Sequence, residues 1–152
     1  MPVLLSCEIE TSDLDTTAIE NTATQLLALC RQEDKELSIL LVSDSRMAAI
    51  NGEYRRKFTP TNVLSFAMQE EPDLFSHNML GDIVISVDTA AREAQEEKIP
   101  LQNRINFLLI HGLLHLLGYD HERSEAEADQ MAGQEQALQK ELTISYKPRS
   151  IS

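Results

Sequence analysis

The chain has 152 residues, of which 42% are hydrophobic and 25% are charged, the balance of an ordinary globular domain with its own core. No apolar run reaches the roughly 20 residues of a membrane span, and the N-terminus lacks a signal-peptide layout, so we expect a cytoplasmic protein with no membrane partner. The net charge of −12 argues against unaided, tight binding of nucleic acid over a broad surface.

The first half of the chain predicts three strands separated by helices. The apolar segment Val3–Ile9 is typical of a strand, and the helix after it, which runs to about Arg31, has apolar residues at helical spacing. The continuous run Leu37–Val42 predicts a buried strand. Asp44 can cap a short helix, and a strand is expected at Val63–Ala67.

The next segment predicts a loop, a strand and a helix. Gln69–Asn78 is polar and contains a proline, which favours a mobile loop. Leu80–Val87 predicts a further strand, and Asp88 can cap a helix that ends near Lys98.

Two helices complete the predicted elements. Pro100 opens a strongly apolar helix, Leu101–Leu117, and Ser124 with Glu127 forms a capping-box pattern for the last helix. The inner stripe of that last helix is expected to consist of Ala128, Met131, Ala132, Leu138 and Leu142.

Strands and helices mix without a regular βαβ rhythm, which predicts an α+β fold. We expect a small single domain over residues 1–142, with a central, mostly four-stranded mixed sheet and about five helices. Residues 143–152 are expected to form a frayed C-terminal tail.

Three histidines, His111, His115 and His121, have the spacing H-x3-H-x5-H. Positions i and i+4 share one face of a helix, so the first two can point their imidazoles at one ion. Gly118 can adopt left-handed backbone angles, turn the chain and bring His121 back as a third ligand. Three imidazoles leave a fourth tetrahedral position open, which predicts one catalytic Zn²⁺ per chain on a buried helix.

The same window matches the long zinc-protease signature except at Gly112, which replaces the glutamate that acts as general base. The ligand spacing is kept and the peptide-cleaving base is absent, which favours a metal-dependent hydrolase with another substrate. A lone histidine on such an apolar helix would be a hydrogen-bonded core residue, but three at this spacing are hard to explain by packing.

The histidine window occurs together with three further motifs, Asn51-Gly-Glu-Tyr-Arg-Arg-Lys, Pro60-Thr-Asn-Val-Leu-Ser-Phe66 and Leu80-Gly-Asp-Ile83. In this combination and order, the chain resembles the YbeY family of bacterial metal-dependent endoribonucleases that mature ribosomal RNA. The resemblance covers most of the chain. Ala67 departs from the family, which often has proline after Ser-Phe.

The resemblance implies a small α+β fold and one zinc ion held by His111, His115 and His121. It also implies a zinc-dependent endoribonuclease that is specific for single strands and acts in 16S rRNA 3′ end maturation and in ribosome quality control. The acidity of the chain makes its own affinity for RNA weak. A ribosomal small-subunit or assembly protein is therefore expected as a partner.

Arg55 is the candidate catalytic side chain outside the histidine window. An arginine fork suits negative charge on phosphoryl oxygens better than a lysine does. From the residues alone, a surface cation at a helix C-terminus explains Arg55 equally well, and the family resemblance favours the functional role. No general base can be named, and Asp120 is open as a partner of a ligand or as a turn residue.

Two other functions remain open from the sequence. One is a metal-dependent protease or peptidase with the same three-histidine ligand set. The other is a non-catalytic ribosome-assembly factor in which the metal is structural. The missing glutamate disfavours the peptidase, and an open coordination position would distinguish an enzyme from the assembly factor.

Overall fold

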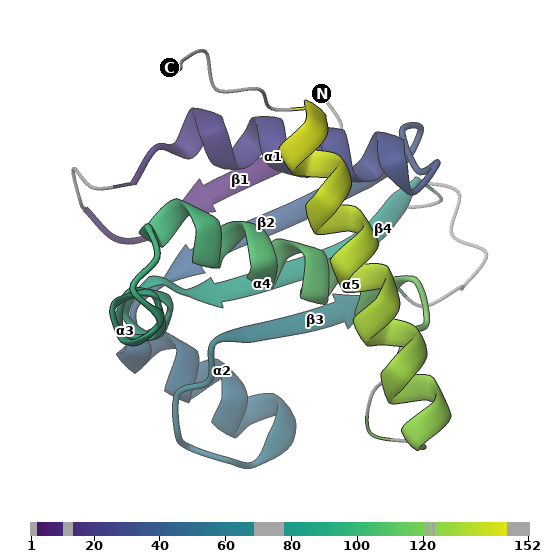
Figure 1. The fold of residues 1–152 in the computed structure, drawn as a ribbon. Helices are drawn as coiled ribbons and strands as arrows, with labels where there is room; N and C mark the ends of the chain where they lie inside the picture. Colours follow the sequence, from purple (N-terminus) through teal and green to yellow (C-terminus); the bar gives the residue numbers. More distant parts are fainter. Residues whose placement is uncertain (1–2, 11–13, 69–77, 121, 123, 146–152) are drawn as a thin grey trace.

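The computed structural model describes residues 3–10, 14–68, 78–120, 122 and 124–145, with only the backbone described for 143–145. Its helices and strands are shown in Figure 1. In chain order they are β1 (Val3–Cys7), α1 (Thr16–Leu29), β2 (Glu36–Val42), α2 (Asp44–Arg55), β3 (Val63–Ala67), β4 (Met79–Ser86), α3 (Val87–Glu97), α4 (Leu101–Leu116) and α5 (Glu125–Ser145).

The strands form one sheet in the order β1-β2-β4-β3. β1, β2 and β4 are parallel, and β3 runs antiparallel to β4 at one edge. The described residues therefore form a four-stranded mixed sheet with five helices, and the predicted α+β class is confirmed. β1 ends at Cys7, two residues before the predicted end.

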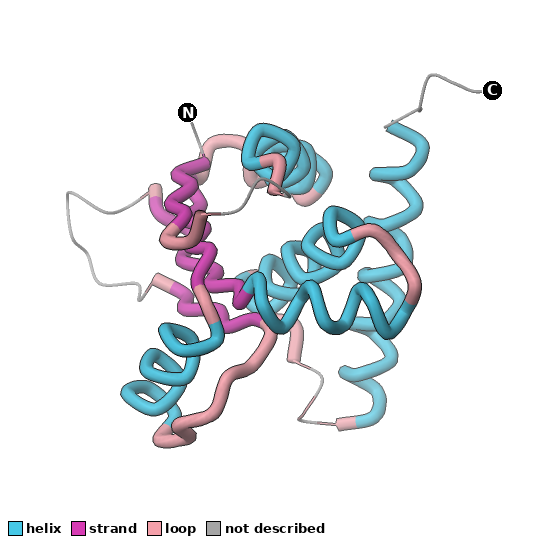
Figure 2. Tube along the Cα trace, turned by 90° about the vertical axis from the view of Figure 1, so that its left-hand side faces the viewer, coloured by secondary structure: helices cyan, strands magenta, loops and turns pink. Residues whose placement is uncertain are grey.

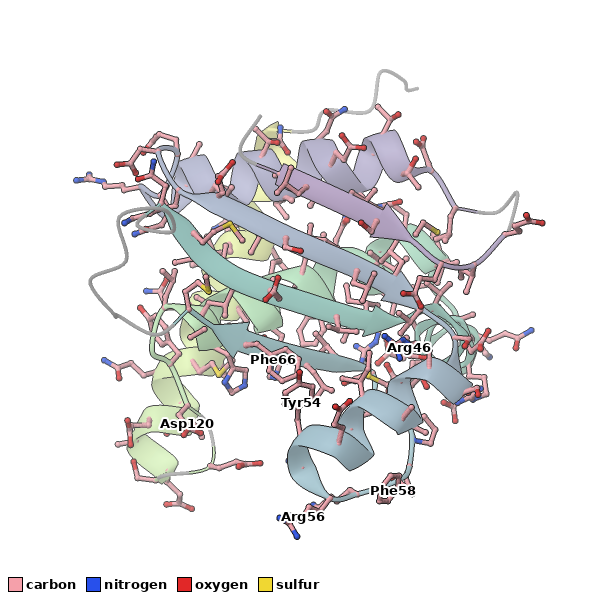
Figure 3. The ribbon with its side chains drawn as sticks, turned by 180° about the vertical axis from the view of Figure 1, so that it is seen from behind. Arg46, Tyr54, Arg56, Phe58, Phe66 and Asp120 are labelled. Carbon is pink, nitrogen blue, oxygen red and sulfur yellow. The ribbon has the colours of Figure 1, made fainter. Side chains whose placement is uncertain are left out.

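Helices lie on both sides of the sheet, as its nearly edge-on view in Figure 2 shows. Ile39 and Ile83 belong to the main core, which α1, α4 and α5 cover. Val42 and Val84 point to the opposite face and pack with α2 in a smaller cluster, the face seen in Figure 3. This alternation follows from the two-residue period of a strand, and it places α2 and α4 on opposite faces of the sheet.

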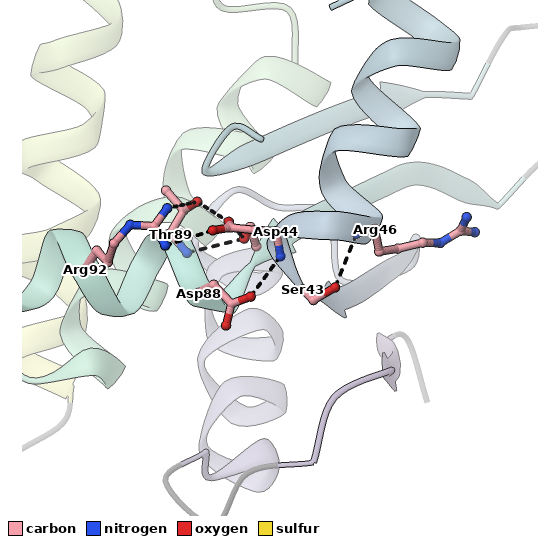
Figure 4. Close-up of polar contacts among 7 residues, drawn as sticks. Ser43, Asp44, Arg46, Asp88, Thr89 and Arg92 are labelled. Carbon is pink, nitrogen blue, oxygen red and sulfur yellow. Dashed lines mark hydrogen bonds and ion pairs between the residues drawn. The ribbon is translucent and has the colours of Figure 1, made fainter. Parts of the chain in front are cut away.

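Serine side chains cap the two helices that follow β2 and β4, so the predicted capping by Asp44 and Asp88 is wrong. Ser43 Oγ accepts a hydrogen bond from the backbone N–H of Arg46 at 3.2 Å, and Ser86 Oγ accepts one from Thr89 at 3.3 Å. The two helices begin side by side (Figure 4), and Asp88 accepts a bond from the N–H of Asp44 across this contact at 2.9 Å.

Asp44 joins the same contact through its own carboxylate. It accepts hydrogen bonds from Ser86 Oγ at 2.7 Å, from Thr89 Oγ1 at 2.6 Å and from Arg92 at 2.8 Å. Burial raises the pKa of this carboxyl, but the three hydrogen bonds and the positive charge of Arg92 together bring the pKa below its ordinary value of 3.8. The Asp44 carboxylate therefore connects the starts of α2 and α3.

Some predictions fall partly beyond the described residues. Residues 69–77, most of the expected loop Gln69–Asn78, lie outside them. α5 reaches Ser145, and the remainder of the expected tail, residues 146–152, also lies outside, so the prediction for the tail stays a prediction. None of the described helices is long and apolar enough to span a membrane.

Candidate metal centre

His111 and His115 lie one turn apart on α4, as their spacing predicts. Their ring centroids are 4.8 Å apart and the rings meet edge to face at 71°. Both side chains are partly buried at the end of a helix whose other residues fill the core, including Leu108, Leu109 and Leu113. The two imidazoles are therefore close enough to bind one ion, and both remain partly accessible to solvent.

Glu135 of α5 orients the first of these rings. His111 Nδ1 lies 2.6 Å from Glu135 Oε2, and the two side chains are only 24% and 15% exposed. A carboxylate at Nδ1 leaves Nε2 as the nitrogen that can bind a metal. Metal-ligating histidines almost always have such a partner on the other ring nitrogen.

Phe107 packs beside the same histidine, one turn earlier on α4. Its ring is stacked on His111 with centroids 6.2 Å apart and planes tilted by 27°. The Arg104 guanidinium lies 4.9 Å from the centre of the Phe107 ring and forms an ion pair with Glu93 at 2.9 Å. His111 is thus held by a carboxylate at one nitrogen and by an aromatic ring on its N-terminal side.

Gly112, between these histidines, packs tightly against the sheet. A Cβ atom there would lie 3.0 Å from Ile83 and 3.1 Å from Ser65 Oγ. Ser65 Oγ also donates a hydrogen bond to the Gly112 carbonyl at 3.0 Å, which joins α4 to β3. A larger residue here, such as the glutamate of a metalloprotease, would require Ile83 and Ser65 to shift by a few tenths of an ångström.

The chain leaves α4 as the histidine spacing predicts. The helix ends at Leu116, and Gly118 has a φ of 100°, a left-handed conformation that suits glycine. Asp120 Oδ1 accepts a hydrogen bond from the Glu122 backbone at 2.8 Å, the geometry of a turn residue. His121 itself lies outside the described residues.

An open hollow of about 280 Å³ adjoins this turn. It is lined by Leu117, Gly118, Tyr119, Asp120, Glu127 and Gln130. The described part of the chain, without His121, contains no cluster of three or more His, Cys, Asp or Glu side chains that could hold a metal. Two imidazoles with one carboxylate behind them nevertheless fit a zinc site that takes its next ligand from the segment after Gly118.

Arg55 belongs to α2, which packs on the other face of the sheet from the helix that carries His111 and His115. It is the last residue of α2, its side chain is exposed, and no described residue forms an ion pair with it. The preceding residue, Tyr54, packs on Phe66 of β3 with ring centroids 5.0 Å apart, as Figure 3 shows. Phe66 follows Ser65, which contacts Gly112. The end of α2 thus packs on one face of the edge strand β3, and α4 contacts the same strand from the other face.

Glu135 is the site residue that the sequence analysis missed. Met131, Leu138 and Leu142 are buried as predicted, but Ala132 is exposed, and Glu135 lies on the inner stripe between Met131 and Leu138. A charged residue four positions after one core residue and three before the next could have indicated a buried polar partner. The sequence did not show which side chain it meets.

Comparisons with known proteins indicate the family of the chain. A family profile described as endoribonuclease YbeY matches residues 5–143. Proteins named endoribonuclease YbeY are similar to the chain. That of Syntrophotalea carbinolica is 48% identical over 79% of this chain and 81% of its own length. That of Geobacter sulfurreducens is 42% identical over 91% of this chain and 93% of its own length.

The fold also resembles a solved structure. The solution structure of TM1509 from Thermotoga maritima matches with a TM-score of 0.59 over 98% of this chain and 99% of the other, at 21% identity. This likeness concerns the fold alone. On the profile match and the curated relatives, the chain belongs to the YbeY endoribonuclease family.

Proposed function

We propose that the protein is a zinc-dependent endoribonuclease that cleaves single-stranded RNA. The observation that supports this most is the pair of imidazoles 4.8 Å apart, one of them oriented by a carboxylate at 2.6 Å, in a chain similar to proteins named endoribonuclease YbeY. Its substrate would be ribosomal RNA, with roles in 16S 3′ end maturation and in ribosome quality control.

His111 and His115 would bind the ion, with His121 as the third ligand and one Zn²⁺ per chain. Imidazoles also suit nickel and copper, and zinc is proposed from ligand type and abundance. When bound, such an ion polarises a phosphoryl oxygen and lowers the pKa of water toward neutrality. The contact of Glu135 with His111 Nδ1 supports this assignment, because it would leave Nε2 as the nitrogen that binds the ion.

Arg55 would supply hydrogen-bond donors to the phosphate that is cleaved. Its guanidinium presents donors in a planar fork that matches two phosphate oxygens, and it stays charged throughout the physiological range. Its exposed position, without an ion pair to any described residue, leaves the guanidinium available to an incoming phosphate. Preorganised donors of this kind stabilise the charge that develops in the transition state.

The intrinsic affinity for RNA would be weak. The net charge of −12 repels a polyanion, and binding should therefore weaken steeply with added salt. A ribosomal small-subunit or assembly protein would bring the enzyme to its substrate.

The discriminating experiment compares cleavage of single-stranded RNA and of casein by zinc-loaded wild-type protein and by His115→Ala. Cleavage of RNA but not casein, lost in the variant, supports the proposal. Casein cleavage would instead support the peptidase alternative. Absence of both activities, in protein that still binds assembling ribosomal particles, would support the non-catalytic assembly factor.

A further inference from the structure

Phe58, just beyond α2, keeps a large aromatic side chain in solvent. It is 76% exposed, the most exposed of the large hydrophobic residues described. Its ring lies against the backbone of Gly52, because a Cβ atom built there would be 2.0 Å from a ring carbon. Gly52 lies inside the helix, where glycine costs about 1 kcal/mol relative to alanine. The Phe58 ring thus packs on the helix at the position where Gly52 has no side chain.

The segment around Phe58 is fixed by hydrogen bonds to the end of the helix. Arg56 has a left-handed φ of 59°, and its N–H donates to the Gly52 carbonyl at 3.0 Å. The buried Asn51 donates from Nδ2 to the Thr59 carbonyl at 2.8 Å. Phe58 therefore sits between two anchored residues, with one side of the ring covered by the helix and the rest open.

Three basic residues lie next to Phe58 in the chain. Arg55, Arg56 and Lys57 precede it directly, all three are exposed, and they account for three of the 13 basic residues in an acidic chain. None of the three forms an ion pair with a described residue. Figure 3 shows Arg56 and Phe58 at the same end of α2, away from the sheet.

A fixed aromatic ring with an open face, preceded in the chain by exposed cations that form no ion pair with a described residue, matches the requirements of single-stranded RNA. Bases that are not in a duplex stack on such rings, while arginine and lysine contact the phosphates. A duplex would offer the phosphates but no open base, and an apolar protein surface would have to desolvate the cations. We infer that Phe58, seated on Gly52, stacks on a base of single-stranded RNA, with Arg56 and Lys57 on the neighbouring phosphates. This inference rests on the proposed function in taking RNA as the ligand.

The chain contains no tryptophan, so Phe58→Trp introduces a single reporter at the proposed contact. Metal-free protein carrying this change is titrated with a single-stranded oligouridine and with duplex RNA of equal phosphate number. Stacking should quench the fluorescence and shield it from acrylamide with the single strand only. Leu4→Trp is the matched control, because Leu4 is 50% exposed on β1, at the opposite edge of the sheet from β3, and it should not respond.

Substitutions separate stacking from a purely structural role. Phe58→Ala should weaken binding of the single strand about fivefold to a hundredfold. Phe58→Leu keeps an apolar cover on Gly52 but has no π-face, and should weaken binding as well, whereas Phe58→Tyr should bind nearly as wild type does. Thermal unfolding of each variant shows whether the fold is kept.

Equal binding by wild type, Phe58→Ala and Phe58→Leu, or equal responses of the two tryptophan reporters, would overturn the inference. RNA cleavage that depends on His115, with no fluorescence response of the tryptophan at position 58, would also overturn the inference. The proposed function would remain supported in that case. A response at position 58 in a protein that cleaves no RNA would support the stacking site and remove the nuclease proposal.

Discussion

His111 Nδ1 and Glu135 Oε2 lie 2.6 Å apart and join α4 to α5 at the candidate metal centre. This contact fixes the imidazole in one of its two possible orientations. The ring is therefore preorganised before an ion arrives, because its rotation is opposed by the carboxylate and by the stacked Phe107.

Glu135→Ala should weaken zinc binding by about 10- to 100-fold, because the ligand loses the group that orients it. The measurement is competition for zinc against a chromophoric chelator. Glu135→Gln should recover part of the affinity, since an amide oxygen can still accept a hydrogen bond from Nδ1. Glu141→Ala, at an exposed position of the same helix, is the control. Equal affinities of Glu135→Ala and wild type would remove Glu135 from the site.

Gly112→Ala should destabilise the protein by up to about 2 kcal/mol, because overpacking against Ile83 and Ser65, at about 1–3 kcal/mol, exceeds the gain of about 1 kcal/mol for alanine over glycine in a helix. Urea unfolding of the metal-free protein measures this. Gly133→Ala provides the comparison, because nothing lies within 4 Å of its Cβ position on α5. That change should raise stability by up to about 1 kcal/mol. A Gly112→Ala variant as stable as wild type would mean that α4 can move from the sheet at little cost.

Much of the site follows from local sequence patterns. Helical spacing places His111 and His115 on one face, and Gly118 takes the left-handed conformation expected where the chain turns. Both depend on residues within a few positions of each other. The histidine window could therefore be located without knowledge of the tertiary structure.

Contacts between separate elements could not be predicted in the same way. Glu135 meets His111 across 24 positions of sequence, and only the packing of α5 on α4 brings them together. The predicted caps at Asp44 and Asp88 were wrong because serines one and two residues earlier, Ser43 and Ser86, cap the helices, and because the two helix starts touch. Side-chain chemistry indicates what a residue can bond to, whereas the fold decides which neighbour it reaches.

Asp44 should make stability depend on acid pH. Because its pKa is lowered by folding, the carboxylate contributes stability above its ordinary value of 3.8, and this contribution is lost as pH falls through the folded pKa. Unfolding free energies across that range should fall less steeply for Asp44→Asn than for wild type, and the two should converge at the acid end. Asp129→Asn, exposed on α5, serves as control. Parallel pH profiles of wild type and Asp44→Asn would contradict the assignment.

Arg55 should affect turnover and leave zinc content and folding unchanged. Loss of a transition-state donor typically costs on the order of a hundred- to a thousandfold in rate. The cleavage rate of Arg55→Ala should therefore be lower than that of wild type by that factor. Arg55→Lys should restore only part of the cleavage rate, since lysine lacks the planar fork of donors. Single-turnover cleavage at matched zinc content is the measurement. Arg46→Ala, at the other end of the same helix, should keep the wild-type rate. Similar cleavage rates for all four proteins would mean that Arg55 has no part in catalysis and is only a surface cation at the helix C-terminus.

The histidines of α4 are proposed to bind a metal that is used in RNA cleavage. Stepwise addition of zinc to metal-free protein, with the single-turnover cleavage rate of single-stranded RNA followed at each step, tests this claim directly. For wild type, we predict negligible cleavage without metal and a rate that reaches its plateau at about one zinc per chain. His115→Ala should stay near the metal-free rate throughout the titration. Full cleavage by metal-free wild type, or a wild-type titration curve from His115→Ala, would contradict the account.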